Sequence, residues 1–255
     1  MNQLTDHFKK DIEYHAITAD LYDHVTVEPR EFANRLLFSD ITKLISPGDR
    51  MLDLGCGTGH IVLRYGQNFK SILAVDHSED MLNIAKKKVL NLQLNSVQFQ
   101  RINIIDFLAQ ETDKYDFISC VGFLHHLPLD ELDKIVLSIK NLLNPNGQVL
   151  VAEPIVTDSI MPVEIQRWNA KSVMQHRGYP EDVVEPDEAP IDLAQLQKIM
   201  TTSGLIEVHS TRGHELFPKN VPATMFDKLS IWYFHRKYGA SGNIFAGLYQ
   251  QALMN

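Results

Sequence analysis

The chain has 255 residues, 44% of them apolar and 22% charged, and a formal net charge of -8. This composition is typical of a globular protein with one well-buried core, and its charge disfavours nucleic-acid binding. We find no apolar run of membrane-spanning length and no signal-peptide core at the first residues, and Cys56 and Cys120 are too few for a disulfide framework. We therefore expect a cytoplasmic protein with no membrane insertion and no nucleic-acid partner.

Strand-length apolar runs alternate with helix-length amphipathic stretches through the middle of the chain. Helices are expected from about residue 60, from a Ser78 N-cap to about residue 92, and over 129–143, where the Asn-Pro-Asn-Gly sequence at 144–147 should stop the last one. This alternation is typical of an α/β fold, a doubly wound, mostly parallel sheet with helices on both faces. The predicted strands are 50–54, 71–75, 97–101, 115–121 and 148–152.

Three further regions complete the predicted organisation around the 47–153 core. Residues 1–46 are expected to form an N-terminal helical cap, with Glu28-Pro29 between its helices. Residues 154–192, rich in proline and acid, form an insertion after the fifth strand, where ligands of such sheets bind. We interpret this insertion as a partly helical lid or acceptor-pocket wall; the alternative is a solvated connection. Residues 193–255 should return to the core and end in a tail.

A glycine turn, Gly55-Cys56-Gly57-Thr58-Gly59, follows the first predicted strand. Alternate glycines let the backbone approach a ligand closely, and the next helix begins there with its N–H groups facing that ligand. The spacing G-x-G-x-G differs from the dinucleotide fingerprint G-x-G-x-x-G, and no Lys-Ser/Thr follows to make a phosphate loop. Asp53, just before the turn, would repel a pyrophosphate but suits an ammonium or sulfonium. The sequence therefore predicts a cationic cofactor without phosphate.

A second acid, Asp76, ends the second predicted strand, about 20 residues beyond the first glycine. A carboxylate at this position can accept hydrogen bonds from both ribose hydroxyls. The alternative is that Asp76 caps the next helix, but Ser78 is better placed for that. We therefore expect Asp76 to bind a ribose.

Five ordered motifs resemble those of class I S-adenosylmethionine-dependent methyltransferases, most of all the group that acts on small molecules, lipids and quinones. The resemblance covers about residues 50–153, with a less specific stretch over 35–50. It implies a Rossmann-like sheet of seven strands whose last pair is antiparallel. Residues 205–211 match the first strand of that pair, whereas 229–238 could be a strand or a helix. The motifs are LDLGCGTG (52–59), VDHSEDML (75–82), NIIDF (103–107), FISCVGFLHHL (117–127) and LLNPNGQVLVAE (142–153).

The resemblance also implies how S-adenosylmethionine is held. The glycine turn passes under its methionine and ribose portion, Asp76 holds the ribose diol, and the backbone of Cys120 or Val121 faces the amino group. A tyrosine of the N-terminal segment closes over the methionine end, and Tyr22 is preferred to Tyr14 because of its Tyr-Asp context. The full set implied is Tyr22, Asp53, Gly55, Cys56, Gly57, Gly59, Asp76, His77 beside the adenosine, Ile105 on the adenine ring, Asp106 at its exocyclic amine, Cys120 and Val121.

Methyl transfer is an in-line displacement that mainly needs alignment of acceptor, methyl and sulfur. A general base is needed only for an acceptor that is protonated at working pH. His125, His126 and Glu153 follow the fourth and fifth strands and are the candidates for that role. The alternatives are that the histidines shape the loop and that Glu153 caps it or pairs with Arg167 of the insertion.

We expect no metal, because a catechol-binding Mg²⁺ site requires a carboxylate cluster and Asp116 lies inside a strand. The aromatic C-terminal region is expected to pack in the core or in a homodimer, or to line the acceptor pocket. The basic run 86–88 is interpreted as the solvated end of a helix. The predicted partner is a small-molecule acceptor whose identity stays open, as does the atom methylated. Alternatives are a tRNA or protein methyltransferase and a non-catalytic binding protein.

Overall fold

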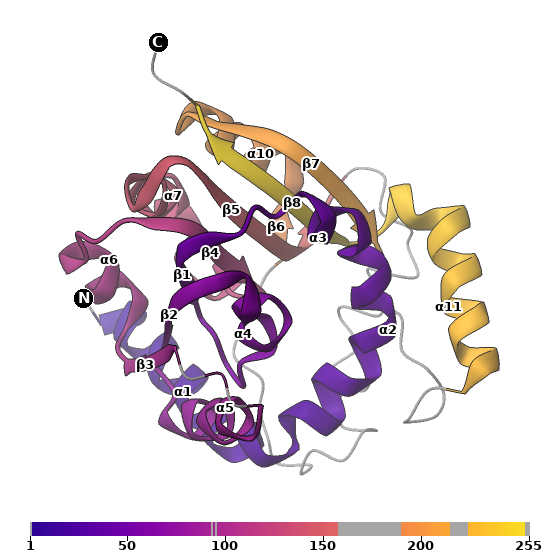
Figure 1. Cartoon of the computed structure of the whole chain (residues 1–255), viewed down its shortest axis with the longest axis horizontal. Helices are drawn as coiled ribbons and strands as arrows, with labels where there is room; N and C mark the ends of the chain where they lie inside the picture. Colours follow the sequence, from indigo (N-terminus) through magenta and orange to yellow (C-terminus); the bar gives the residue numbers. More distant parts are fainter. Residues whose placement is uncertain (1, 93, 95, 158–189, 215–223, 253–255) are drawn as a thin grey trace.

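A computed structural model describes the chain except residues 1, 93, 95, 158–189, 215–223 and 253–255 (Figure 1). Its centre is an eight-stranded sheet in which seven strands follow the order β3-β2-β1-β4-β5-β8-β7 and β6 pairs with β5. The first five strands in this order are parallel, whereas β8 runs antiparallel to both of its neighbours. The strands are β1 Gly48–Leu54, β2 Phe69–Asp76, β3 Val97–Arg101, β4 Tyr115–Val121, β5 Leu143–Val156, β6 Ile191–Asp192, β7 Leu205–Gly213 and β8 Ile244–Gln251.

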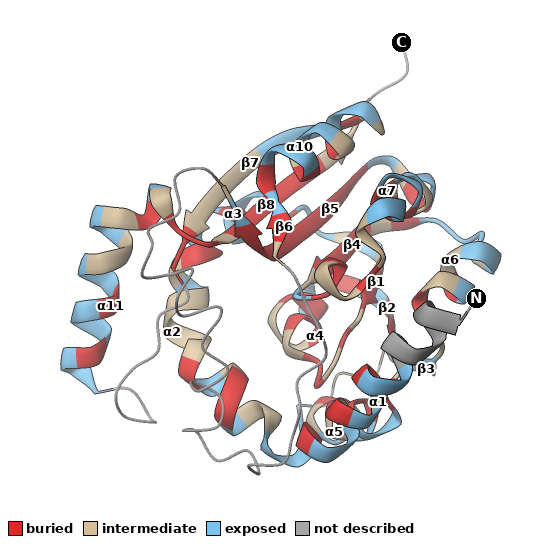
Figure 2. Ribbon diagram, turned by 180° about the vertical axis from the view of Figure 1, so that it is seen from behind, coloured by how far each residue is buried: buried red, intermediate tan, exposed pale blue. Residues whose placement is uncertain are grey.

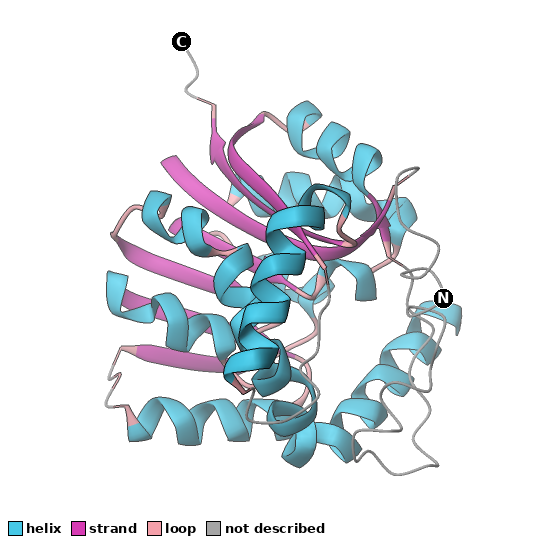
Figure 3. Ribbon diagram, turned by 90° about the vertical axis from the view of Figure 1, so that its right-hand side faces the viewer, coloured by secondary structure: helices cyan, strands magenta, loops and turns pink. Residues whose placement is uncertain are grey.

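Alternate residues of the buried strands face two separate hydrophobic clusters, one on each side of the sheet. In β5, Val149 and Val151 belong to one cluster, and Leu150 belongs to the other. Side chains of α6 (Ile104–Gln110), α7 (Leu132–Asn141) and α10 (Leu193–Thr202) complete the first. Those of α2 (Glu28–Leu37), α3 (Ser39–Leu44), α4 (His60–Tyr65) and α5 (Glu79–Asn91) complete the second. The predicted doubly wound sheet is therefore confirmed, with the strands buried between helices (Figures 2 and 3).

Local sequence signals account for several boundaries. The Ser78 hydroxyl accepts a hydrogen bond from the Met81 N–H, which is the N-cap predicted for α5. The predicted helix over 129–143 is shorter, since α7 follows a 3₁₀ turn and ends at Asn141. The Asn-Pro-Asn-Gly sequence then lies in β5, where Asn146 has a φ of 64° and the pairing with β4 shifts register.

The N-terminal segment is helical from Asn2 to Leu44 apart from a turn at Phe38. The helix α1 (Asn2–Tyr22) continues through a π-helical turn (Asp23–Val27) into α2, and it packs against α5. Pro29 stands in the first turn of α2, directly after the π-helical turn, so its missing N–H falls where the regular α-helical hydrogen bonding is already interrupted. None of the helices among the described residues combines the length and apolar character needed to cross a bilayer.

The C-terminal region resolves the alternative left open by the sequence. Residues 229–238 are helical, within α11 (Met225–Tyr238), and β8 is the antiparallel partner of β7. Phe245 and Tyr249 of β8 are buried in the core, as expected for the aromatic region. Phe226, Trp232 and Tyr233 of α11 are exposed instead, so only part of that region packs inside the described chain.

Candidate cofactor and acceptor site

The glycine turn after β1 is built from left-handed backbone. Gly55, Gly57 and Gly59 have φ values of 66°, 50° and 84°, a region that side chains other than glycine rarely adopt. A Cβ on Gly55 would lie 2.5 Å from the Phe123 ring, whereas a Cβ on Gly57 would meet no described heavy atom within 4 Å. The turn is fastened to β2 by a hydrogen bond from the Cys56 N–H to the Val75 carbonyl. Gly57 thus presents bare backbone to open space at the carboxyl edge of the sheet.

Asp76 lies directly across this turn. Its Oδ2 accepts a hydrogen bond from the Gly57 N–H at 2.8 Å, and its Oδ1 accepts one from the Ser78 N–H, also at 2.8 Å. A carboxylate has about four acceptor directions, so two remain after these bonds. Asp76 therefore both shapes the glycine turn and retains the capacity to bind a diol.

Asp53 lies beneath the turn and is almost fully buried. Its Oδ1 accepts a 2.6 Å hydrogen bond from the Ser119 hydroxyl, while its Oδ2 is buried and accepts none from the described residues. Burial raises the pKa of Asp53 to about 7, partly offset by the Ser119 hydrogen bond and reinforced by the charge of Asp76. A buried carboxyl with an unused oxygen is suited to a cationic ligand, because a nearby positive charge favours its ionised form.

The sheet opens beside this turn. The β1–β4 pairing ends at Leu54 and Cys120, whereas Val121 pairs only with Ala152 of β5. The next residue, Gly122, has a φ of 63° and open space at its Cβ position among the described residues. Strand order reverses between β1 and β4, and ligands of doubly wound sheets bind at such a switch point.

The remaining predicted contacts lie around the same edge. Ile105 and Asp106 form the first turn of α6, whose N-cap Asn103 accepts a hydrogen bond from the Ile105 N–H. Asp106 is exposed, and Ile105 is half-buried against the core. Asp116 lies at the other end of β4, where its Oδ2 accepts hydrogen bonds from the backbone of Asp49 and Arg50, far from the edge that carries the turn.

The N-terminal segment is docked on the glycine turn. Asp23 accepts a 2.7 Å hydrogen bond from the Thr58 hydroxyl and forms an ion pair with Lys88. Lys88 also donates to the Thr58 carbonyl at 3.0 Å. The sequence interpretation of the basic run is therefore wrong for Lys88, although Lys86 and Lys87 are exposed as expected. Tyr22, at the end of α1, lies with its ring 5.9 Å from that of His15.

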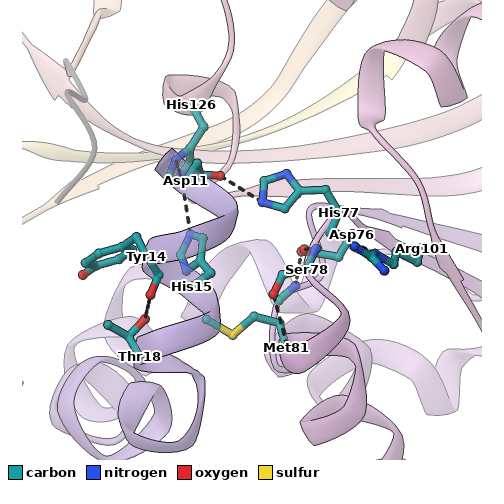
Figure 4. A network of polar contacts seen from close by, with 11 residues as sticks. Asp11, Tyr14, His15, Thr18, Asp76, His77, Ser78, Met81, Arg101 and His126 are labelled. Atoms are coloured by element: carbon teal, nitrogen blue, oxygen red, sulfur yellow. Dashed lines mark hydrogen bonds and ion pairs between the residues drawn. The ribbon is translucent and has the colours of Figure 1, made fainter. Parts of the chain in front are cut away.

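Three histidines surround one buried aspartate of α1 (Figure 4). Asp11 has an exposed fraction of only 2%, and its Oδ2 lies 3.0 Å from His77 Nε2. Its Oδ1 lies 3.3 Å from His126 Nδ1 and 3.4 Å from His15 Nε2. Burial opposes ionisation of this carboxyl, but the histidine contacts outweigh it and hold its pKa well below the usual range. The cluster joins α1 to the loops after β2 and β4.

His125 pairs with β5, although its ring centroid lies only 4.2 Å from that of His126. Its Nδ1 lies 2.7 Å from Oε2 of Glu153, whose side chain is fully buried. Oε1 of the same carboxylate accepts hydrogen bonds from the N–H groups of Phe123 and Leu124, at 3.0 and 2.8 Å. Glu153 therefore organises the loop after β4 with both of its oxygens.

Sequence reasoning missed Asp11, His15 and Asp23. The D-x-x-x-H spacing of the first two places them on one helix face, which was a readable signal, but their partners are distant in sequence. The insertion, including its proposed Arg167 partner for Glu153, lies almost entirely outside the described residues.

The sequence model of the Methyltransferase domain family matches residues 45–214. The chain is 24% identical over 152 residues to a ubiquinone biosynthesis O-methyltransferase of Acinetobacter baylyi, covering 58% of this chain and 63% of that protein. It is 30% identical over 105 residues to an uncharacterized protein of Rickettsia prowazekii, covering 40% and 42%. The chain thus spans about half the length of the curated relatives it matches.

Solved structures share the fold over most of the chain. The complex of DhpI with SAH has a TM-score of 0.65 at 14% identity, covering 96% of this chain and 97% of that one. Magnesium protoporphyrin IX methyltransferase from Synechocystis with bound SAH has a TM-score of 0.58 at 15% identity, covering 89% and 85%. At such low identity these likenesses establish the fold alone, and it is the fold that the five motifs implied.

Proposed function

We propose that this chain, which belongs to the Methyltransferase domain family, transfers the methyl group of S-adenosylmethionine to a small-molecule acceptor. The observation that carries the proposal is the open backbone at Gly57, held by Asp76, which has spare acceptor capacity, and preceded in the same strand end by Asp53, which has a buried oxygen that accepts no hydrogen bond from the described residues. This donor and acceptor set suits an adenosyl group bearing positive charge, and it lacks the features that bind pyrophosphate.

The residues present fit that cofactor. Asp76 would hold the ribose hydroxyls, and Ile105 with Asp106 would hold the adenine. The strand end at Cys120 and Val121, with Tyr22 from α1, would hold the methionine portion. The bound cofactor supplies an activated methyl group with a good leaving group.

The task of the chain is then to orient an acceptor and to receive its proton where it has one. In the His125–Glu153 pair, Nδ1 faces the carboxylate, and a histidine oriented through Nδ1 in this way accepts a proton at Nε2 in the established general-base arrangement. Glu153 positions that ring and the loop, and His126 is turned toward Asp11. We therefore assign proton acceptance to His125, with Glu153 as a positioning residue.

A small-molecule acceptor is supported by the similarity to a ubiquinone biosynthesis O-methyltransferase, and the acidic charge of the chain disfavours a nucleic-acid acceptor. A cytoplasmic location and the absence of a nucleic-acid partner belong to the same proposal. The atom methylated and the acceptor itself are left to experiment.

Calorimetry of the purified chain tests the cofactor. We expect S-adenosylhomocysteine to give a binding heat with a stoichiometry of one molecule per chain, and NADH to give none. The reverse result overturns the proposal. Incubation with labelled S-adenosylmethionine and cell extract, followed by mass spectrometry, then identifies the acceptor. Label appearing only on RNA or protein would overturn the small-molecule assignment.

The role of His125 is tested by His125→Gln and Glu153→Gln with the identified acceptor. Loss of the base should lower kcat by about 10²–10⁴-fold with S-adenosylhomocysteine affinity unchanged in His125→Gln. An unchanged kcat would remove His125 from the reaction.

A further inference from the structure

The cluster around Asp11 has donor atoms that a metal ion uses. One ligand atom from each of Asp11, His15 and His126, a carboxylate oxygen and two ring nitrogens, lies within 4.8 Å of the others. Two imidazoles with one carboxylate form a ligand set typical of divalent transition metals with open coordination positions. The sequence expectation of no metal concerned a carboxylate-rich Mg²⁺ site, which is a different donor set.

The spacing of these atoms agrees with coordination. Asp11 Oδ1 lies 3.3 Å from His126 Nδ1 and 3.4 Å from His15 Nε2. Two ligands each bound at 2.0–2.1 Å to a tetrahedral zinc ion are separated by about 3.4 Å. Good N–H···O hydrogen bonds are shorter, at about 2.7–3.2 Å, and Oδ1 makes none that meets hydrogen-bond geometry with the described residues. The two distances thus match the edges of a coordination polyhedron better than two hydrogen bonds.

The surroundings are also those of a metal site. Asp11 is buried, and the side chains of His15 and His126 are each only 16% exposed. The second carboxylate oxygen lies 3.0 Å from His77 Nε2, as an outer partner that fixes the orientation of a ligating carboxylate. Figure 4 shows the rings of His15 and His126 directed at Asp11 from α1 and from the loop after β4.

We propose that Asp11, His15 and His126 bind one divalent transition-metal ion of the Zn²⁺ type. The ion fastens α1 to the loop that carries His125 and so fixes the N-terminal segment over the site edge. The remaining coordination positions are filled by water or by a ligand in the cleft. This site goes beyond the methyltransferase proposal, and metal binding is measured without any cofactor, so either idea can fail alone.

The test titrates the EDTA-treated full chain with Zn²⁺ by calorimetry and with Co²⁺ by visible absorption, whose bands report coordination geometry. We expect one ion per chain and a higher melting temperature with Zn²⁺. In Asp11→Asn and His15→Ala the affinity should fall by more than the roughly 10–100-fold that loss of an outer partner causes. The melting temperature of each variant in EDTA, compared with that of the metal-free wild type, shows whether it still folds.

His24→Ala is the matched control, because His24 forms an exposed (i, i+4) pair with Glu28 on the same N-terminal segment. It should bind Zn²⁺ as the wild type does. The absence of Co²⁺ bands from wild type, or equal Zn²⁺ affinity in wild type, Asp11→Asn and His15→Ala, would overturn the proposal and leave the cluster as a set of histidine–carboxylate contacts.

Discussion

The two halves of the sheet, divided along its strand order, are built differently. In the β3-β2-β1-β4 part, strands follow one another in parallel with a helix after each, and short motifs fix the loops at the carboxyl edge. In the β5-β8-β7 part, the last strand of the chain inserts between two earlier ones, after the long helix α11. The first arrangement is readable from local sequence, whereas the second depends on which distant segment fills the gap. Substitutions in the first half should therefore change both stability and ligand binding, whereas substitutions in the second half should change stability alone.

The largest effect is expected at Gly55. Alanine there must adopt a left-handed φ and place its Cβ 2.5 Å from Phe123, which together should lower the free energy of unfolding by about 2–5 kcal/mol. Gly57→Ala has the backbone strain without the clash, so about 1–2 kcal/mol is expected, with a loss of S-adenosylhomocysteine binding. Urea unfolding and calorimetry on both variants check this, and equal stability losses would contradict it.

Next comes Asp76→Ala, which removes the acceptor that we propose for the ribose diol and the support of the Gly57 and Ser78 N–H groups. We expect S-adenosylhomocysteine to bind about 100-fold more weakly, as for the loss of charge-assisted hydrogen bonds. Asp113→Ala is the control, since Asp113 is an exposed acid paired with Arg50. Wild-type affinity in Asp76→Ala would remove this carboxylate from the site.

Substitutions in the C-terminal helix α11 should change the free energy of unfolding but not ligand binding. Ile231 is the buried apolar residue of α11, at 5% exposure, whereas Leu229 on the same helix is 58% exposed. Ile231→Ala should cost about 2 kcal/mol of unfolding free energy, and Leu229→Ala should stay within about 0.5 kcal/mol. Neither should change S-adenosylhomocysteine affinity. A large loss in Leu229→Ala would mean that another surface covers this face, and sedimentation of the same pair examines the expected homodimer.

A pH dependence of stability is expected from Asp53. Because its pKa is raised to about 7, the folded state holds a proton that the unfolded state has already lost above its ordinary value of 3.8. Unfolding free energy should therefore fall as pH rises toward 7, by at most about 1.4 kcal/mol per unit. Asp53→Asn removes this slope, so its stability relative to wild type should increase from pH 5 to pH 7. Urea titrations at these values check the sign, and parallel pH curves would contradict the assignment.

The same carboxyl predicts a linkage with the cofactor. A cation beside Asp53 favours the ionised form, so binding near pH 6.5 should release a proton and tighten as pH rises through about 7. Calorimetry in buffers of different ionisation enthalpy measures the number of protons released on binding. The Asp53→Asn variant should release none.

The parallel half of the sheet and its carboxyl edge, where we propose that the cofactor binds, could be predicted from local sequence. The left-handed turn at 55–59 needs glycine, Ser78 caps α5 locally, and Asp76 follows directly from the end of a strand. These features depend on residues close together in sequence, whose backbone preferences are fixed by sterics and capping.

The contacts of Lys88, Glu153 and Asp11 could not be predicted in this way, because they depend on segments that are distant in sequence. In the sequence Lys88 belongs to an ordinary basic run, but in the fold it forms an ion pair with Asp23 of the N-terminal segment. Glu153 accepts hydrogen bonds from N–H groups of the loop that follows β4. Asp11 contacts His15 of its own helix and two histidines from distant loops, His77 and His126. A long-range contact has no period or spacing in the sequence, because its partners meet only when the helices close over the sheet.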